Sequence, residues 1–120
     1  MLITLQDDGV LYIYPSVEDA VRDVEALDAE NTFRVVFDET GHRYAIHWIR
    51  KNQRGLFFMV ENGEYMLVRD GTVDAGALLG LIRDAEWVDP ESLRPWLLDL
   101  ASRLTNRFSG PASPAAERPS

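Results

Sequence analysis

The stretch that decides the fold is VVFDETGHRYAIHWIR, residues 35–50. Two largely apolar segments flank Glu-Thr-Gly, and glycine favours the tight turns that join antiparallel strands. We therefore expect residues 32–38 and 42–50 to pair as a hairpin. Successive side chains of a strand point to opposite faces, so His42 and His47 should lie on opposite faces of the second strand. Two histidines placed in this way do not share a metal ion or a proton.

The sequence before this hairpin predicts another hairpin, followed by a helix. Residues 2–5 and 10–14 are short apolar segments joined by a turn that contains Asp-Gly, a favourable turn pair. Ser16 follows a proline and is a suitable N-cap residue. Apolar residues then recur at helical spacing, and acidic residues occupy the positions between them. This pattern predicts an amphipathic helix over residues 17–27.

A third hairpin is expected around Asn-Gly at residues 62–63, with strands over 56–61 and 64–69. Asn-Gly between two apolar segments favours a type I′ turn, because both residues tolerate positive φ angles. Such a turn would place Met59 opposite Met66. Both faces of this hairpin are apolar, so we expect it at the centre of the sheet or covered on both sides.

The C-terminal part predicts two helices and a tail. Helical spacing extends over residues 74–86, and a last helix should begin near 92–94, because Pro95 is tolerated only in a first turn. Residues 109–120 are rich in proline, serine and alanine and are expected to form a disordered tail. The order ββαββββαα over residues 1–108 describes one α+β domain. Its antiparallel sheet of about six strands, in three hairpins, is packed by about three helices.

The charge is concentrated near the N-terminus. The chain has a net charge of −8, and residues 1–31 contain eight acidic residues against the single base Arg22. An acidic chain is a poor nucleic-acid ligand, because contacts to phosphate dominate that affinity. Such a chain suits a basic protein partner. The residues expected to contact this partner are the acids of the first turn and first helix, and one tryptophan beside a basic loop: Asp7, Asp8, Glu18, Asp19, Asp23, Glu25 and Trp48.

Patterns typical of catalysis are not found. The sequence has no cysteine, no pair of histidines at metal-ligand spacing, no nucleophile elbow and no glycine-rich phosphate loop. We therefore expect no enzymatic activity, no catalytic residue, no cofactor and no bound metal. The first residues lack a basic segment followed by a long apolar one, and no segment approaches about 18 consecutive apolar residues. A cytoplasmic protein without membrane contact is expected, and its oligomeric state stays open.

Two segments carry a resemblance to a known class of proteins: LYIYPSVEDAVRDVEALDAE, residues 11–30, and FDETGHRYAIHWIR, residues 37–50. They resemble small bacterial immunity proteins, which are encoded beside polymorphic toxins and protect their producers during bacterial competition. The resemblance implies a protein that binds a cognate toxin, often a basic nuclease or another nucleotide-acting enzyme, and occludes its active site. It contains no defining motif from which functional residues could be transferred. The toxin would act in the cytoplasm.

Three alternatives stay open. A secretion chaperone or adaptor for an effector would also be small and acidic, and a dimer with a large apolar interface would favour it. A small enzyme could use a carboxylate–histidine site, which a pocket lined by His42 or His47 and two acids would favour. The last alternative is a structural or interaction domain with another role.

Overall fold

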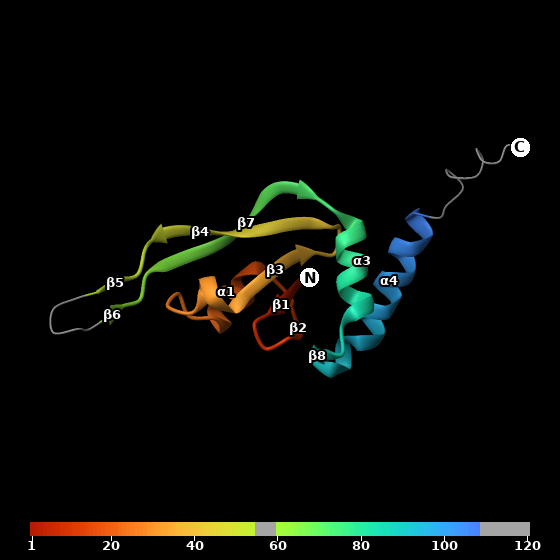
Figure 1. Cartoon of the computed structure of the whole chain (residues 1–120), viewed down its shortest axis with the longest axis horizontal. Helices are drawn as coiled ribbons and strands as arrows, with labels where there is room; N and C mark the ends of the chain where they lie inside the picture. The colour runs from red at the N-terminus through yellow and green to blue at the C-terminus, as the bar shows by residue number, and fades with distance from the viewer. Residues whose placement is uncertain (55–59, 109–120) are drawn as a thin grey trace, which may run out of the picture.

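A six-stranded mixed sheet, in the order β7-β4-β3-β1-β2-β8, forms the centre of the fold. The structure is a computed structural model that describes residues 1–54 and 60–108. The strands of the sheet are β1 (Leu2–Gln6), β2 (Val10–Tyr14), β3 (Phe33–Asp38), β4 (His42–Arg50), β7 (Glu64–Val73) and β8 (Trp87–Asp89). A separate two-stranded ribbon consists of β5 (Gln53–Arg54) and β6 (Val60–Glu61), at the end of the molecule opposite α3 and α4 (Figure 1).

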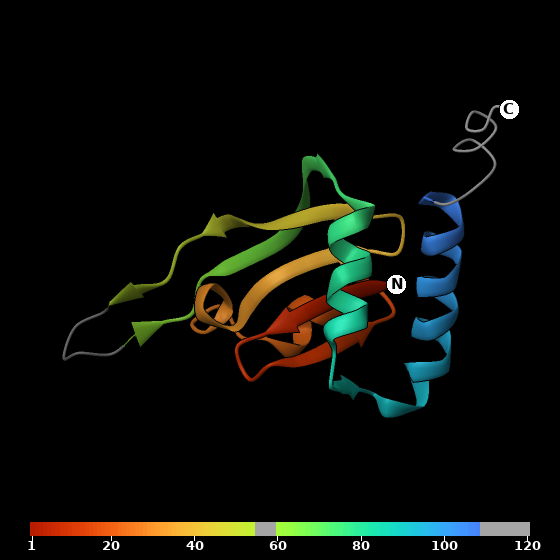
Figure 2. The ribbon, with the colours of Figure 1, turned by 45° about the vertical axis from the view of Figure 1, so that its right-hand side comes forward.

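Helices cover both faces of the sheet. They are α1 (Val17–Asp23), α2 (Ala29–Thr32), α3 (Ala75–Asp84), the 3₁₀ helix η2 (Glu91–Leu93) and α4 (Arg94–Phe108). Helices α3 and α4 lie side by side (Figure 2), and their buried leucines pack against Ile3, Ile13 and Phe37. On the opposite face, α1 packs with Leu2 and Tyr14. The α+β class is therefore confirmed, with two hydrophobic clusters separated by the sheet.

The N-terminal hairpin and the helix after it are confirmed, but the helix is shorter than expected. Gly9 has a φ of +81°, as the turn between β1 and β2 requires. Helix α1 begins after the N-cap Ser16 and ends at Asp23 instead of residue 27. Val24 is extended, and its carbonyl accepts a hydrogen bond from the Tyr65 hydroxyl at 2.6 Å. The helix therefore ends before Val24, whose carbonyl is hydrogen-bonded to a residue of β7 and not to a later residue of the helix.

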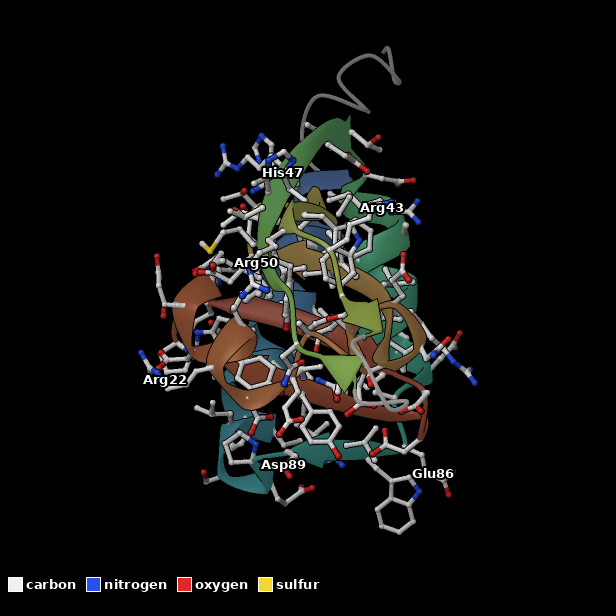
Figure 3. The ribbon with its side chains drawn as sticks, turned by 90° about the vertical axis from the view of Figure 1, so that its left-hand side faces the viewer. Arg22, Arg43, His47, Arg50, Glu86 and Asp89 are labelled. Atoms are coloured by element: carbon white, nitrogen blue, oxygen red, sulfur yellow. The ribbon has the colours of Figure 1, made fainter. Side chains whose placement is uncertain are left out.

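The central hairpin is also confirmed, with a looser pairing than the sequence implies. Strands β3 and β4 are joined at a single register pair, Phe37 and Arg43, and do not pair beyond it. Along β4, residues 42, 44, 46 and 48 are half-buried, and the residues between them are exposed. His42 and His47 therefore lie on opposite faces, as expected, and His47 is exposed on the β4–β7 hairpin (Figure 3).

The third predicted hairpin is wrong. Strand β7 exists, but it pairs with β4, so that Met66 lies opposite His47 and not opposite Met59. Strand β7 is the edge of the sheet and not its centre, and only one of its faces is buried. Gly63 has no positive φ, so the expected type I′ turn is not formed. Residues 55–59 of the predicted strand lie outside the described part of the chain.

Gly63 has a different function at this point, namely a close approach between two backbone segments. A Cβ atom on Gly63 would lie 2.1 Å from the carbonyl oxygen of Arg50 and 2.8 Å from the backbone nitrogen of Asn52. The Gly63 N–H also donates to Asn52 Oδ1 at 2.7 Å. Gly63, directly before β7, therefore lies against the backbone at the end of β4, where a side chain would not fit.

The C-terminal helices are confirmed, and a parallel strand was missed. Helix α3 and helix α4 match the predicted segments at 74–86 and from 92–94 onward. Strand β8 pairs in parallel with β2, with Leu11 opposite Val88, so the sheet is mixed and not purely antiparallel. No helix of the described chain is both long enough and apolar enough to span a membrane. The predicted tail, residues 109–120, lies outside the described residues.

Two alanine substitutions test the role of Gly63. Gly63→Ala should destabilise the protein, because its Cβ would collide with backbone atoms that cannot move independently. Gly80→Ala is the matched control: it lies in α3 with nothing within 4 Å of the added Cβ. It should stabilise the helix by about 0.5–1 kcal/mol. Urea unfolding measures both changes, and a neutral Gly63→Ala would contradict the close approach.

Candidate functional site

An acidic pocket of about 390 Å³ lies on the face of the sheet that carries α1. It is formed where β2 passes the C-terminal end of α1 and the loop that leads to α2. Its lining residues are Gln6, Tyr12, Asp23, Val24, Glu25, Asp28 and Thr32. Three of these seven residues are carboxylates, so the pocket combines negative charge with an aromatic ring and a buried amide.

Two tyrosines bring acids from separate segments together. Tyr12 and Tyr14 alternate with core residues of β2 and share one face, where their rings stack with centroids 6.4 Å apart. The Tyr12 hydroxyl donates to Asp8 of the preceding turn, and the Tyr14 hydroxyl donates to Asp23 of α1, each at 2.6 Å. The first turn and the first helix therefore present their acids on the same side.

The pKa values of the tyrosines report this concentration of negative charge. The hydrogen bond to Asp8, with burial and the nearby charges of Asp8, Asp89 and Asp23, raises the pKa of Tyr12 to about 12. Burial and the hydrogen bond to Asp23 raise the pKa of Tyr14 as well. The same Tyr12 bond lowers the pKa of Asp8. Both tyrosines therefore stay neutral and Asp8 stays charged at physiological pH.

The predicted partner-binding residues divide into separate groups. Asp23 and Glu25 line the pocket, and Asp8 accepts a hydrogen bond from Tyr12 of its lining, whereas Asp7 and Glu18 are exposed outside the lining. Asp19 is already engaged: its backbone N–H donates to the Ser16 side chain, and its carboxylate pairs with Arg22 at 2.9 Å.

Sequence reasoning missed four residues of this site: Gln6, Tyr12, Tyr14 and Asp28. The available signal was the alternation in β2, which places both tyrosines on one face. That signal could not show which helix faces them.

The acids that line the pocket are not paired with a base among the described side chains. No ion pair in that part of the chain includes Asp23, Glu25 or Asp28. Arg22 is largely exposed, and Figure 3 shows it pointing outward from α1. Uncompensated charges at a concave site attract cations of the opposite sign from solution.

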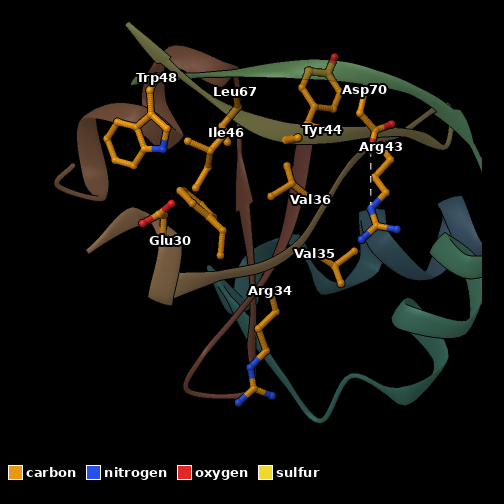
Figure 4. Close-up of a pocket in the computed structure, with 12 residues that line it drawn as sticks. Glu30, Arg34, Val35, Val36, Arg43, Tyr44, Ile46, Trp48, Leu67 and Asp70 are labelled. Carbon is orange, nitrogen blue, oxygen red and sulfur yellow. Dashed lines mark ion pairs between the residues drawn. The ribbon is translucent and has the colours of Figure 1, made fainter. Parts of the chain in front are cut away.

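Trp48 belongs to a different cavity, a cleft of about 510 Å³ between β3 and β4 (Figure 4). The cleft shares no lining residue with the acidic pocket. It opens because the two strands diverge after their single register pair, so Val36 and Ile46 face each other across a gap. Arg43 and Asp70 form a loose ion pair of 4.0 Å at its wall. The cleft has a mixed polar and apolar lining with balanced charge, and Trp48 contributes to the core beside Tyr65.

The histidine in the central turn contacts a carboxylate indirectly. His42 Nδ1 lies 2.7 Å from the Thr40 hydroxyl, which donates to Asp38 Oδ1 at 2.5 Å. Because this hydroxyl donates to the carboxylate, His42 is not positioned to remove its proton. Asp38 also accepts hydrogen bonds from Tyr44 and Arg69, each at 3.1 Å. The network holds the turn together, and His42 does not line the adjacent cavity.

Among the described residues, no group of three His, Cys, Asp or Glu side chains is arranged to hold a metal ion. Comparisons with protein-family models, curated proteins and solved structures find no match to this chain.

Asp38→Asn should destabilise the protein in a pH-dependent way. Burial disfavours the charged carboxylate, but hydrogen bonds from Thr40, His42 and Tyr44 outweigh it and lower the pKa of Asp38. The stabilisation is therefore complete above the unfolded value of about 3.9 and is lost as the pH falls through the folded pKa. The expected cost of the substitution near pH 7 is about 1.5–3 kcal/mol.

Urea unfolding at several pH values measures this difference. It should be constant from roughly pH 5 to 7 and decrease below about pH 4. Asp99→Asn is the control, because its ion pair with Arg103 is exposed and should contribute less than about 1 kcal/mol. An Asp38→Asn deficit that persists unchanged at pH 3 would show that the charge is not responsible.

Proposed function

We propose that this protein is an immunity protein that binds a basic, cytoplasm-acting bacterial toxin and occludes its active site. The observation that carries the proposal is the acidic pocket, whose carboxylates have no basic partner in the described chain. The resemblance of residues 11–30 and 37–50 to immunity proteins supports the same function. The contact surface is the acidic pocket with its rim, including the turn at Asp7 and Asp8.

Electrostatics accounts for how such a protein would find its partner. Opposite charges accelerate encounter far above the rate of neutral surfaces, and this acceleration decreases with salt because the Debye length shortens. A toxin that acts on nucleotides carries basic groups at its active site to hold phosphate. The carboxylates of Asp23, Glu25 and Asp28 would form ion pairs with those basic groups. The rest of the protein would then prevent the substrate from entering the active site. Exclusion of substrate requires no chemistry by the immunity protein.

A secretion chaperone is the second candidate, and one observation favours it. The exposed face of the β4–β7 hairpin carries apolar side chains, with Ile49 60% and Val68 42% exposed. Exposed apolar groups of this kind occur at protein interfaces, including those of chaperone dimers. The activity of the captured partner separates the candidates. An immunity protein abolishes that activity, whereas a chaperone preserves it.

The direct test is affinity capture of the partner from the native bacterium, followed by kinetics on three forms of the protein. Glu25→Lys/Asp28→Lys should bind with an on-rate reduced by at least about tenfold at low salt. Asp84→Lys/Glu86→Lys has the same net charge but changes exposed acids outside the pocket lining. It should stay within about threefold of the wild type. The difference between the two variants should decrease as salt is added.

Surface plasmon resonance provides these rates, and thermal unfolding confirms that both variants are folded. Equal on-rates for the two variants at every salt concentration would place the interface elsewhere. A captured partner that stays fully active in the complex would reject the immunity function and favour the chaperone.

A further inference from the structure

We propose that the acidic pocket holds one arginine side chain of the partner protein. The inference deepens the proposed function, since it names the group that the contact surface recognises. The pocket volume of about 390 Å³ lies within the range of roughly 300–1,000 Å³ that is usual for ligand sites. Three features of its lining select a guanidinium group: a buried acceptor, an aromatic ring and a spread of carboxylates.

The buried acceptor is the side-chain carbonyl of Gln6, a residue that is only 5% exposed. Gln6 Nε2 donates to the hydroxyl of Thr4 at 3.1 Å and to that of Tyr14 at 3.0 Å. Both hydroxyls use their own protons elsewhere, Thr4 toward the carbonyl of Tyr12 and Tyr14 toward Asp23. They can therefore only accept from Gln6, which fixes the orientation of the amide.

This orientation leaves Gln6 Oε1 for an incoming donor. The described part of the chain provides no hydrogen-bond donor to this oxygen, and Gln6 lines the pocket. A buried acceptor without a donor is unfavourable, because it has lost its hydrogen bonds to water. A ligand that donates to Gln6 Oε1 therefore gains more than one that only approaches the exposed carboxylates.

The aromatic ring and the carboxylates favour arginine over other cations. A guanidinium group is planar, stacks on aromatic rings such as that of Tyr12, and presents five N–H donors in a fixed arrangement. Asp23, Glu25 and Asp28 lie around the pocket and are not arranged as metal ligands. The N–H donors of a guanidinium group are spread over a plane and can reach several of these carboxylates at once. The compact ammonium group of lysine would reach fewer carboxylates.

The test is an NMR titration of the isotope-labelled full chain with N-acetyl-arginine amide. The side-chain amide of Gln6 and the ring of Tyr12 should shift saturably, with a Kd of roughly 1–10 mM, as expected for a ligand of this size. N-acetyl-citrulline amide, the neutral isostere, should bind at least about tenfold more weakly. N-acetyl-lysine amide should bind more weakly than the arginine probe.

Two conservative variants complete the design. Asp28→Asn should raise the Kd for the arginine probe by at least about threefold, since it removes one charge-assisted acceptor. Asp84→Asn, outside the pocket, should leave the Kd unchanged. The inference is overturned if Gln6 does not shift, if citrulline shifts it equally, or if the two variants behave alike.

The probe requires no partner protein, so the two proposals can fail separately. If the arginine probe binds but no basic partner is captured, the proposed arginine pocket stands and the proposed immunity function is rejected. If a basic partner is captured but the probe does not bind at Gln6, the proposed immunity function stands and the proposed arginine pocket is rejected.

Discussion

The carboxylate of Asp38 connects the β4–β7 hairpin to the remaining strands of the sheet. It ends β3, accepts hydrogen bonds from the turn to β4, and pairs with Arg69 of β7 at 3.1 Å. Strands β3 and β4 share only one register pair, so the β4–β7 hairpin is held at its base by Asp38 and farther along by contacts with the segment after α1, such as the hydrogen bond from Tyr65 to Val24. The hairpin can diverge from β3 and still return over α1, because this buried charge holds its base. The cleft beside Trp48 is a direct result of that divergence.

The two faces of the sheet have different tasks. Helices α3 and α4 form a closed apolar cluster with β1, β2 and β3, in which eleven residues are buried. The other face is covered only in part by the short helix α1, whose early end is fixed by the hydrogen bond between Tyr65 and Val24. The chain from Val24 to Asp28 therefore lies between α1 and α2 as a bend and a turn, and it lines the pocket with Val24, Glu25 and Asp28. The shortness of α1 creates the acidic site.

Local sequence patterns predicted most helices and strands. They could not predict how the strands pair, because that pairing depends on contacts between residues far apart in the sequence. The turn at Gly9, the N-cap at Ser16 and the alternation of β4 each depend on a few neighbouring residues, and all were confirmed. The pairing of β7 with β4 depends on the close approach at Gly63, which looks like an ordinary Asn-Gly turn in the sequence. Strand β8 has three residues, too few for a periodic signal.

The acidic site was predicted in part for the same reason. Asp8, Asp23 and Glu25 could be identified from the sequence by their charge alone. Acidic side chains that have no basic partner are almost never buried, so they are expected on the surface. Gln6 and the two tyrosines look like ordinary strand residues in the sequence. In the structure Gln6 and Tyr12 line the pocket, and Tyr14 is hydrogen-bonded to Gln6 and Asp23 of its lining. Trp48 was grouped with the acids because aromatic residues are common at interfaces, but the fold places it in the second hydrophobic cluster.

The parallel pairing of β2 with β8 also determines the order of events during synthesis. Strand β2 is complete once Tyr14 has emerged from the ribosome, but its outer neighbour arrives only with residues 87–89. Until then β2 presents an unpaired edge, and such edges associate with strands of other chains. Contacts this distant in sequence also slow folding. Asp7 and Asp8 lie in the turn directly before β2, and charged residues beside an open strand edge oppose such association.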